Sequence, residues 1–161
     1  MGVTCGLCPQ FVAEFTEGRL SLTWRDIDAM REAYNEVYAY TMGRPGFILQ
    51  HVVDAFSAQT ATDATKAIGI IFALVGLYLR VERQFSGSEI QKVHVRLARQ
   101  KRPWPTVVLP QDRGSMTVAD VLAVPEGDDR DRAIDAWCRS VWSAFCDVRP
   151  TIIALLREYH I

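Results

Sequence analysis

The side chains that could form a chemical site fall into two groups in this sequence of 161 residues. The first group is Cys5 and Cys8, two thiols three residues apart, with Gly6 between them. Thiolates at this spacing can bind one metal ion, and zinc would need two further nitrogen or sulfur ligands. The chain offers no second ligand pair at metal spacing, so His51 or another distant residue would have to complete the set. A zinc site, structural thiols and a redox pair therefore all stay open.

The second group lies further along the chain. His51 and Asp54 are three residues apart, so on a helix they share one face. A histidine beside a carboxylate can act as a general base or as a metal ligand. The spacing also suits a structural histidine that donates to the carboxylate or to a backbone carbonyl. Tyr34 and Tyr38 could line an apolar cavity with a polar rim, and Arg80 could bind a substrate carboxylate or phosphate.

Composition and charge limit the classes of partner. Hydrophobic residues make up 49% of the chain, charged residues 23%, and the net charge is −1, all ordinary for a globular protein. This balance argues against a nucleic-acid partner, although basic residues gather between 92 and 102, where the acidic residues of 126–135 could neutralise them. The longest apolar run, 67–79, is shorter than a membrane span of about twenty residues. We therefore expect no membrane segment and, since no secretory leader is visible, a cytoplasmic location.

The elements that must position these side chains are predicted to be helices. Apolar residues recur with helical spacing along most of the chain, and no sheet is required. The sequence therefore predicts an all-α fold: a compact bundle of five to six helices forming one domain over 1–161, with 1–20 as an N-terminal CxxC arm. A long proline-containing loop is expected near 103–116. Capping boxes are predicted where Thr or Ser precedes Asp or Glu by three residues, at 23–26, 86–89 and 117–120.

Two glycines stand out in the apolar helix predicted over about 65–85. Gly69 and Gly76 are seven residues apart, so they fall on one face of that helix. Both are therefore expected to allow a neighbouring helix to approach closely.

Five segments, taken in order, resemble the bacterial family of unknown function DUF5946. They are Cys5-x-x-Cys8, Val53-Asp54-Ala55-Phe56, Leu79-Arg80-Val81-Glu82-Arg83, Thr117-Val118-Ala119-Asp120-Val121-Leu122-Ala123 and Trp137-Cys138-Arg139-Ser140-Val141-Trp142. The resemblance covers about residues 5–155 and implies no activity. It also implies family histidines at positions that are Leu49, Thr60 and Ala73 here. A family metal site would then be lost in this chain or rebuilt around His51.

These patterns favour a pocket between helices that binds a small organic molecule. His51 and Asp54 would supply acid–base chemistry, with or without a metal, and a cyclase or lyase of a specialised pathway would suit a small helical protein. The alternative is a non-catalytic interaction or regulatory module in which a metal pins the N-terminal arm to the bundle. Whether the protein is an enzyme stays open, and aromatic residues on helix faces leave a homodimer open as well.

Overall fold

The computed structural model describes residues 23–44 and 49–161. In these ranges the chain forms seven α-helices and a short 3-10 helix and contains no strand, which confirms the predicted all-α class. The predicted N-terminal arm lies outside the described residues. The elements are α2 (Ile27–Met42), α3 (Leu49–Gln59), α4 (Ala67–Arg83), α5 (Gly87–Ala98), α6 (Val118–Leu122), α7 (Asp128–Ala144), η1 (Cys146–Val148) and α8 (Arg149–Glu158).

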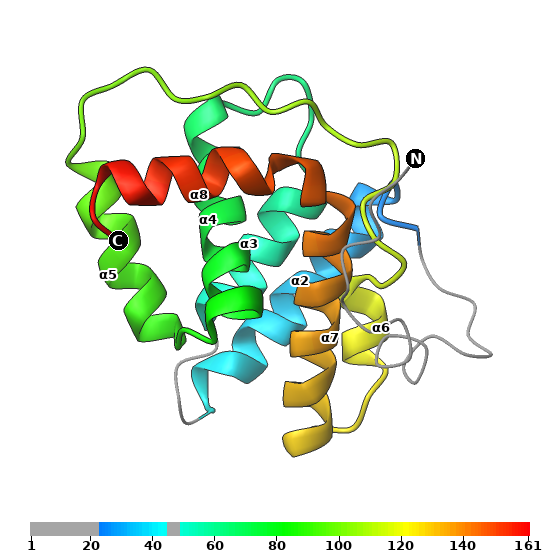
Figure 1. Cartoon of the computed structure of the whole chain (residues 1–161). Coiled ribbons are helices and arrows are strands. Elements are labelled where there is room, and N and C mark those ends of the chain that lie inside the picture. Colours follow the sequence, from blue (N-terminus) through cyan, green and yellow to red (C-terminus); the bar gives the residue numbers. More distant parts are fainter. Residues whose placement is uncertain (1–22, 45–48) are drawn as a thin grey trace.

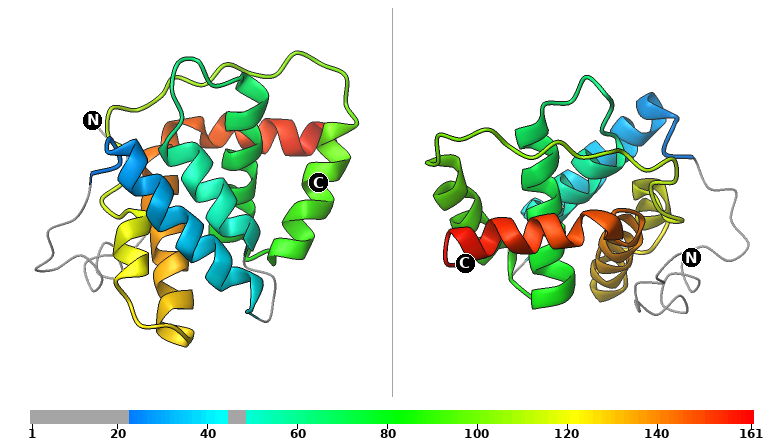
Figure 2. Two further views of the ribbon diagram at one scale, coloured as in Figure 1. Left: turned by 180° about the vertical axis from the view of Figure 1, so that it is seen from behind. Right: turned by 45° about the horizontal axis from the view of Figure 1, so that its top comes forward.

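Helix α3 lies at the centre of the arrangement, because α2, α4, α5 and α7 all contact it. The short α6 packs between α2 and α7, and α8 crosses α4 (Figure 1). The long connection from α5 to α6 arches over one end of the bundle, as the two further views show (Figure 2). A polar side chain on the inner face of α3 is therefore enclosed by several helices.

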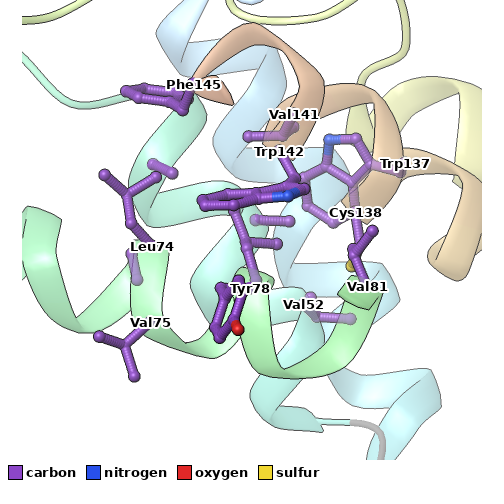
Figure 3. Packing of buried hydrophobic residues seen from close by; sticks show 14 of the residues in the cluster. Val52, Leu74, Val75, Tyr78, Val81, Trp137, Cys138, Val141, Trp142 and Phe145 are labelled. Carbon is purple, nitrogen blue, oxygen red and sulfur yellow. The ribbon is translucent and has the colours of Figure 1, made fainter. Parts of the chain in front are cut away.

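Helix α4 is buried on nearly all sides, as its apolar sequence predicts. Between Ile70 and Val81 only Phe72 and Arg80 are partly exposed. Tyr78 of this helix packs against Trp142 of α7, with ring centroids 6.0 Å apart (Figure 3). Burying a large apolar side chain contributes about 1.5–3 kcal/mol, so this contact region is a main source of stability.

Two of the predicted capping boxes are present. The backbone N–H of Glu89 donates to Ser86 Oγ over 3.3 Å, and the Ser86 N–H donates to Glu89 Oε2 over 2.7 Å. At the start of α6, the N–H of Thr117 donates to Asp120 Oδ2 over 2.8 Å. Each carboxylate satisfies a donor that the helix leaves unpaired, and each fixes where its helix begins.

The predicted capping box at Thr23 is wrong. The N–H of Asp26 donates to the carbonyl of Thr23 over 3.0 Å, which closes a turn instead of a helical cap. Helix α2 begins at Ile27, and Asp26 precedes it without a side-chain capping bond. The residue pattern at 23–26 therefore forms a turn, and the helix begins only after Asp26.

The proline-containing connection between α5 and α6 has no regular secondary structure, as predicted. Arg113 holds the connection against the bundle from inside. Its guanidinium donates to the carbonyls of Pro110, Ala61 and Ala58 over 2.6, 3.0 and 3.4 Å. This buried arginine ties the loop to the end of α3 and to the residues that follow it.

Candidate acid–base site

His51 and Asp54 lie on the inner face of α3, where they are only 2% and 3% exposed. The spacing of three residues places them in the same turn, as the sequence predicts. Helix α7 packs over this turn, because the Cys138 thiol donates to the backbone carbonyl of His51 over 3.6 Å. Burial raises the pKa of that thiol well above its usual value, so Cys138 serves as a packing group and weak donor.

The Asp54 carboxyl group is held by one hydrogen bond only. Gln50, one turn earlier, donates from Nε2 to Asp54 Oδ1 over 2.8 Å, whereas Oδ2 is buried without a hydrogen-bond partner. Burial raises the pKa of this carboxyl group well above its ordinary value, and the Gln50 bond opposes the rise. Asp54 is therefore a neutral, protonated acid under conditions in which an exposed aspartate would be charged.

Gly76 of α4 makes room for this carboxyl group. A Cβ atom added at Gly76 would overlap Asp54 Oδ2, so no larger residue fits there without a shift of the side chain. The predicted close approach at Gly76 is thus confirmed. Gly69 has only the Thr65 methyl group near its Cβ position, at 3.8 Å, and it is exposed, so the prediction is wrong there.

The His51 ring has a free nitrogen. Its Nδ1 atom is buried and has no hydrogen-bond partner. Burial lowers the pKa of the imidazole to about 3, and the positive charge of Arg80 lowers it further. His51 is therefore neutral at ordinary pH, which leaves an imidazole nitrogen available as a proton acceptor or as a metal ligand.

Tyr34 of α2 completes one wall of the site. Its ring stacks on Phe56 of α3 with centroids 4.1 Å apart, and it touches Tyr38 with centroids 5.8 Å apart. Burial raises the pKa of the Tyr34 hydroxyl, and Tyr38 and Asp54 raise it further. Tyr34 thus lies near Asp54, and its hydroxyl keeps its proton.

Arg80 reaches the site from α4, one turn after Gly76. Its guanidinium forms a two-point ion pair with Asp135 of α7, from Nε over 2.9 Å and from Nη2 over 2.8 Å. A further donor reaches the Phe85 carbonyl over 3.3 Å. The positive charge of Arg80 lowers the pKa of His51. The two N–H donors that could pair with an anionic substrate, however, already bind Asp135.

The structure brings His51, Asp54, Tyr34 and Arg80 together, with Tyr38 beside Tyr34. Cys5 and Cys8, the predicted thiolate ligands, lie outside the described residues. Within 23–44 and 49–161, no group of three histidine, cysteine, aspartate or glutamate side chains could hold a metal ion. Leu49, Thr60 and Ala73, at the positions of the expected family histidines, bring no such ligand; Thr60 donates to the Phe56 carbonyl over 2.7 Å.

Sequence reasoning missed two residues that shape this site, Gln50 and Cys138, and the partner of a third, Gly76. Gln50 could have been found, because it precedes Asp54 by one helical turn and can reach its carboxyl group. The contact of Cys138 with α3 and the fit of Gly76 around Asp54 join residues far apart in the sequence. Local spacing carries no signal for either contact.

His94, the other histidine within the bundle, is a satisfied structural residue. Its Nε2 atom lies 2.9 Å from the Phe72 carbonyl oxygen, so this nitrogen must carry the proton and donate. Burial lowers the pKa of His94, although the bond to Phe72 opposes the change. His51 has no comparable partner for Nδ1.

The basic residues between 92 and 102 do not pair with the acidic residues of 126–135, which corrects the expectation from the sequence. Arg102 instead pairs with Glu158 over 2.7 Å, and Arg96 donates to the Tyr159 carbonyl over 2.7 Å. The acidic residues pair elsewhere; Asp131, for example, binds Arg44 over 2.6 Å. Among the described residues, the basic residues of 92–102 therefore contact the end of α8, whereas Asp131 of the acidic segment contacts the end of α2.

The fold and the site define a compact all-helical protein with a buried histidine and a buried aspartic acid in one turn of its central helix. The chain belongs to the family of unknown function DUF5946, whose model matches residues 4–146. Searches of curated proteins and of solved structures find no match. Among the described residues no helix combines the length and apolar character needed to span a bilayer.

Proposed function

We propose that this protein is an acid–base enzyme that acts on a small uncharged organic molecule at His51 and Asp54. One observation carries the proposal: His51 Nδ1 and Asp54 Oδ2, within one turn of α3, are both buried and have no hydrogen-bond partner in the described ranges 23–44 and 49–161. Leaving a buried polar atom unpaired costs about 1–3 kcal/mol. A ligand that pairs with both atoms would recover this energy, and unsatisfied buried groups in native proteins often mark such sites.

The protonation states suggest the reaction. A neutral imidazole accepts a proton at Nδ1, and a protonated carboxyl group donates a hydrogen bond from Oδ2. His51 would remove a proton from a carbon next to a substrate carbonyl, while Asp54 stabilises the negative charge that develops on the carbonyl oxygen. A carboxylic acid kept neutral by an apolar site can act in this way. Proton transfer of this kind begins many ring closures and eliminations, which fits a cyclase or lyase.

The surrounding residues would bind and tune the substrate. Tyr34 and Tyr38 supply aromatic surface with hydroxyl groups for a small organic body. Arg80 would act through its charge, which disfavours the charged form of His51, since its donors bind Asp135. Because His51 and Asp54 are almost fully buried, substrate must enter by displacing covering side chains.

The reaction can be tested without knowledge of the natural substrate. A panel of small ketones, aldehydes and esters would be incubated with the protein in deuterated water, and protein-dependent deuterium uptake next to the carbonyl would be measured by NMR. We expect uptake with the wild type and with His94→Gln, the control histidine, and a loss of at least about a hundredfold in His51→Gln. Equal exchange in His51→Gln and wild type would overturn the proposal, as would no exchange with any compound.

The free Nδ1 nitrogen also favours a second candidate, a zinc site formed by His51 with the Cys5 and Cys8 thiolates. A neutral imidazole nitrogen without a partner is a suitable ligand atom. Such a metal could assist catalysis, or it could only pin the N-terminal arm in a non-catalytic interaction module. Metal analysis of protein purified without chelator should then give one zinc per chain, lost in Cys5→Ser/Cys8→Ser and reduced in His51→Gln. No stoichiometric metal in the wild type would exclude this candidate.

A further inference from the structure

A cavity lies where α8 crosses the end of α4, away from His51 and Asp54. It has a volume of about 300 Å³, and its lining comes from α4, the turn after it, and α8 with the residues that follow. Its apolar lining includes Leu79, Phe85 and Leu156, and three arginines, Arg83, Arg149 and Arg157, line it as well. No acidic side chain lines it. The volume is at the lower end of the range typical of small-molecule sites.

Two of the three arginines are available to a ligand. Arg149 already binds Glu82, with Nε 2.8 Å from each carboxylate oxygen. Arg83 and Arg157 are exposed and have no ion-pair partner among the residues that the structure describes. Arg83 and Arg157 therefore bring positive charge to the edge of an apolar surface, in a chain whose net charge is −1.

Tyr78 also lines the cavity. Tyr78 is 6% exposed, and its hydroxyl has no hydrogen-bond partner among the described residues. Its ring is fixed by packing against Trp142 (Figure 3), so the position of the hydroxyl is set by the core. An unpaired hydroxyl in such a place is a donor ready for a ligand oxygen.

We propose that this cavity binds a small amphipathic carboxylate, separately from the acid–base site. The apolar body, a short acyl chain or a ring, would rest on Leu79, Phe85 and Leu156. The carboxylate would pair with Arg83 and Arg157, whose planar guanidinium groups match its two oxygens, and Tyr78 would donate to it. A carboxylate suits the site better than a doubly charged phosphate, because an apolar surface makes the desolvation of a second negative charge costly.

Calorimetric titration with octanoate tests the proposal, with octanol as the uncharged probe of the same length. The variants are Arg83→Gln, Arg157→Gln and Ile153→Trp, which places a larger side chain in the cavity lining. Arg99→Gln is the control, since Arg99 is exposed and lies outside the cavity. Circular dichroism would establish that each variant keeps its helical content.

We expect saturable binding of octanoate and much weaker binding of octanol. Each arginine substitution should weaken octanoate binding by about tenfold, which is the loss expected for one charge-assisted contact near a surface. Ile153→Trp should abolish binding, and Arg99→Gln should leave it unchanged. Absence of saturable octanoate binding to the wild type would overturn the proposal, as would equal affinity in the wild type and in Arg83→Gln/Arg157→Gln.

Discussion

Gln59 and Asp54 lie five residues apart on α3 and are both buried, yet their polar atoms differ in what surrounds them. Gln59 is fully paired: Oε1 accepts from Trp137 Nε1 over 2.9 Å, and Nε2 donates to the carbonyls of Arg113 and Met116 over 3.1 and 2.8 Å. Asp54, by contrast, leaves Oδ2 unpaired beside an unpaired His51 nitrogen. At the Gln59 end of α3, the buried polar groups form hydrogen bonds that stabilise the fold. At the His51–Asp54 end, two buried polar atoms have no partner among the described residues.

This difference distinguishes buried polar groups that stabilise the fold from buried polar groups that could act on a ligand, within one helix. A buried network in which every group has a partner rigidifies the fold, and removing one member leaves the others unpaired. A buried group that lacks a partner contributes nothing of this kind, so its removal should cost little stability and should affect the chemistry instead. The comparison can therefore be tested by substitutions at each end of α3.

The largest effect is expected for Gln59→Met, which keeps the side-chain size and removes all three hydrogen bonds. It would leave the Trp137 N–H and two backbone carbonyls buried without partners, so we expect a loss of about 3–6 kcal/mol in the free energy of unfolding. Urea denaturation followed by circular dichroism measures it. Gln50→Met, which removes one bond to Asp54 in the same helix, is the matched control; it leaves a single oxygen unpaired and should cost about 1–2 kcal/mol. Similar losses in the two variants would remove the contrast between the ends of α3.

The next effect concerns His51 and pH. Its folded pKa of about 3 lies below the unfolded value of about 6.5, so between these pH values the unfolded chain binds more protons. The contribution of His51 to stability should therefore rise with pH through this window and level off above it. His51→Gln should remove this rise, and the difference between variant and wild type should change by about 2–4 kcal/mol across the window. Urea denaturation at intervals from pH 3 to 7 measures the difference, and parallel curves for the two proteins would show that His51 is not buried and neutral.

Gly76→Ala tests the fit around Asp54. The added Cβ would overlap the carboxyl group, and overpacking of this kind costs about 1–3 kcal/mol. In the Asp54→Ala background the carboxyl atoms are gone, so the same substitution should cost much less. A double-mutant cycle from thermal or urea unfolding gives the coupling between the two sites. Additive effects would contradict the close approach of α3 and α4 at this point.

The sequence could predict what depends on local spacing. The capping boxes at Ser86 and Thr117, the all-round burial of α4 and the shared face of His51 and Asp54 all follow from residues within one or two turns. Pro150 likewise lies in the first turn of α8, where its missing N–H is not needed. These features were predicted because neighbours in sequence decide them.

Contacts between distant segments could not be predicted in this way. Whether Arg80 would face a substrate or an internal acid depends on Asp135, which is 55 residues away. The hydrogen bonds of Gln59 to Trp137 and to the loop carbonyls form only because α7 and the α5–α6 connection pack against α3. Which buried polar groups stay unpaired is a property of the assembled fold, and this property distinguishes the two ends of α3.

The smallest change in stability is expected for Asp54→Asn. An amide keeps the carbonyl that accepts from Gln50 and closely matches the size and neutrality of a protonated acid. At about pH 3, where Asp54 is protonated in the folded chain and largely protonated in the unfolded chain, the unfolding free energy should therefore stay within about 1 kcal/mol of the wild type. The folded pKa of Asp54 is raised, so the folded wild type binds more protons above about pH 4 and loses stability as pH rises; the variant should lack this loss. Deuterium exchange should nevertheless fall sharply, because an amide is a far weaker acid than a carboxyl group. A large loss of stability with unchanged exchange would instead place Asp54 with Gln59 among the structural groups.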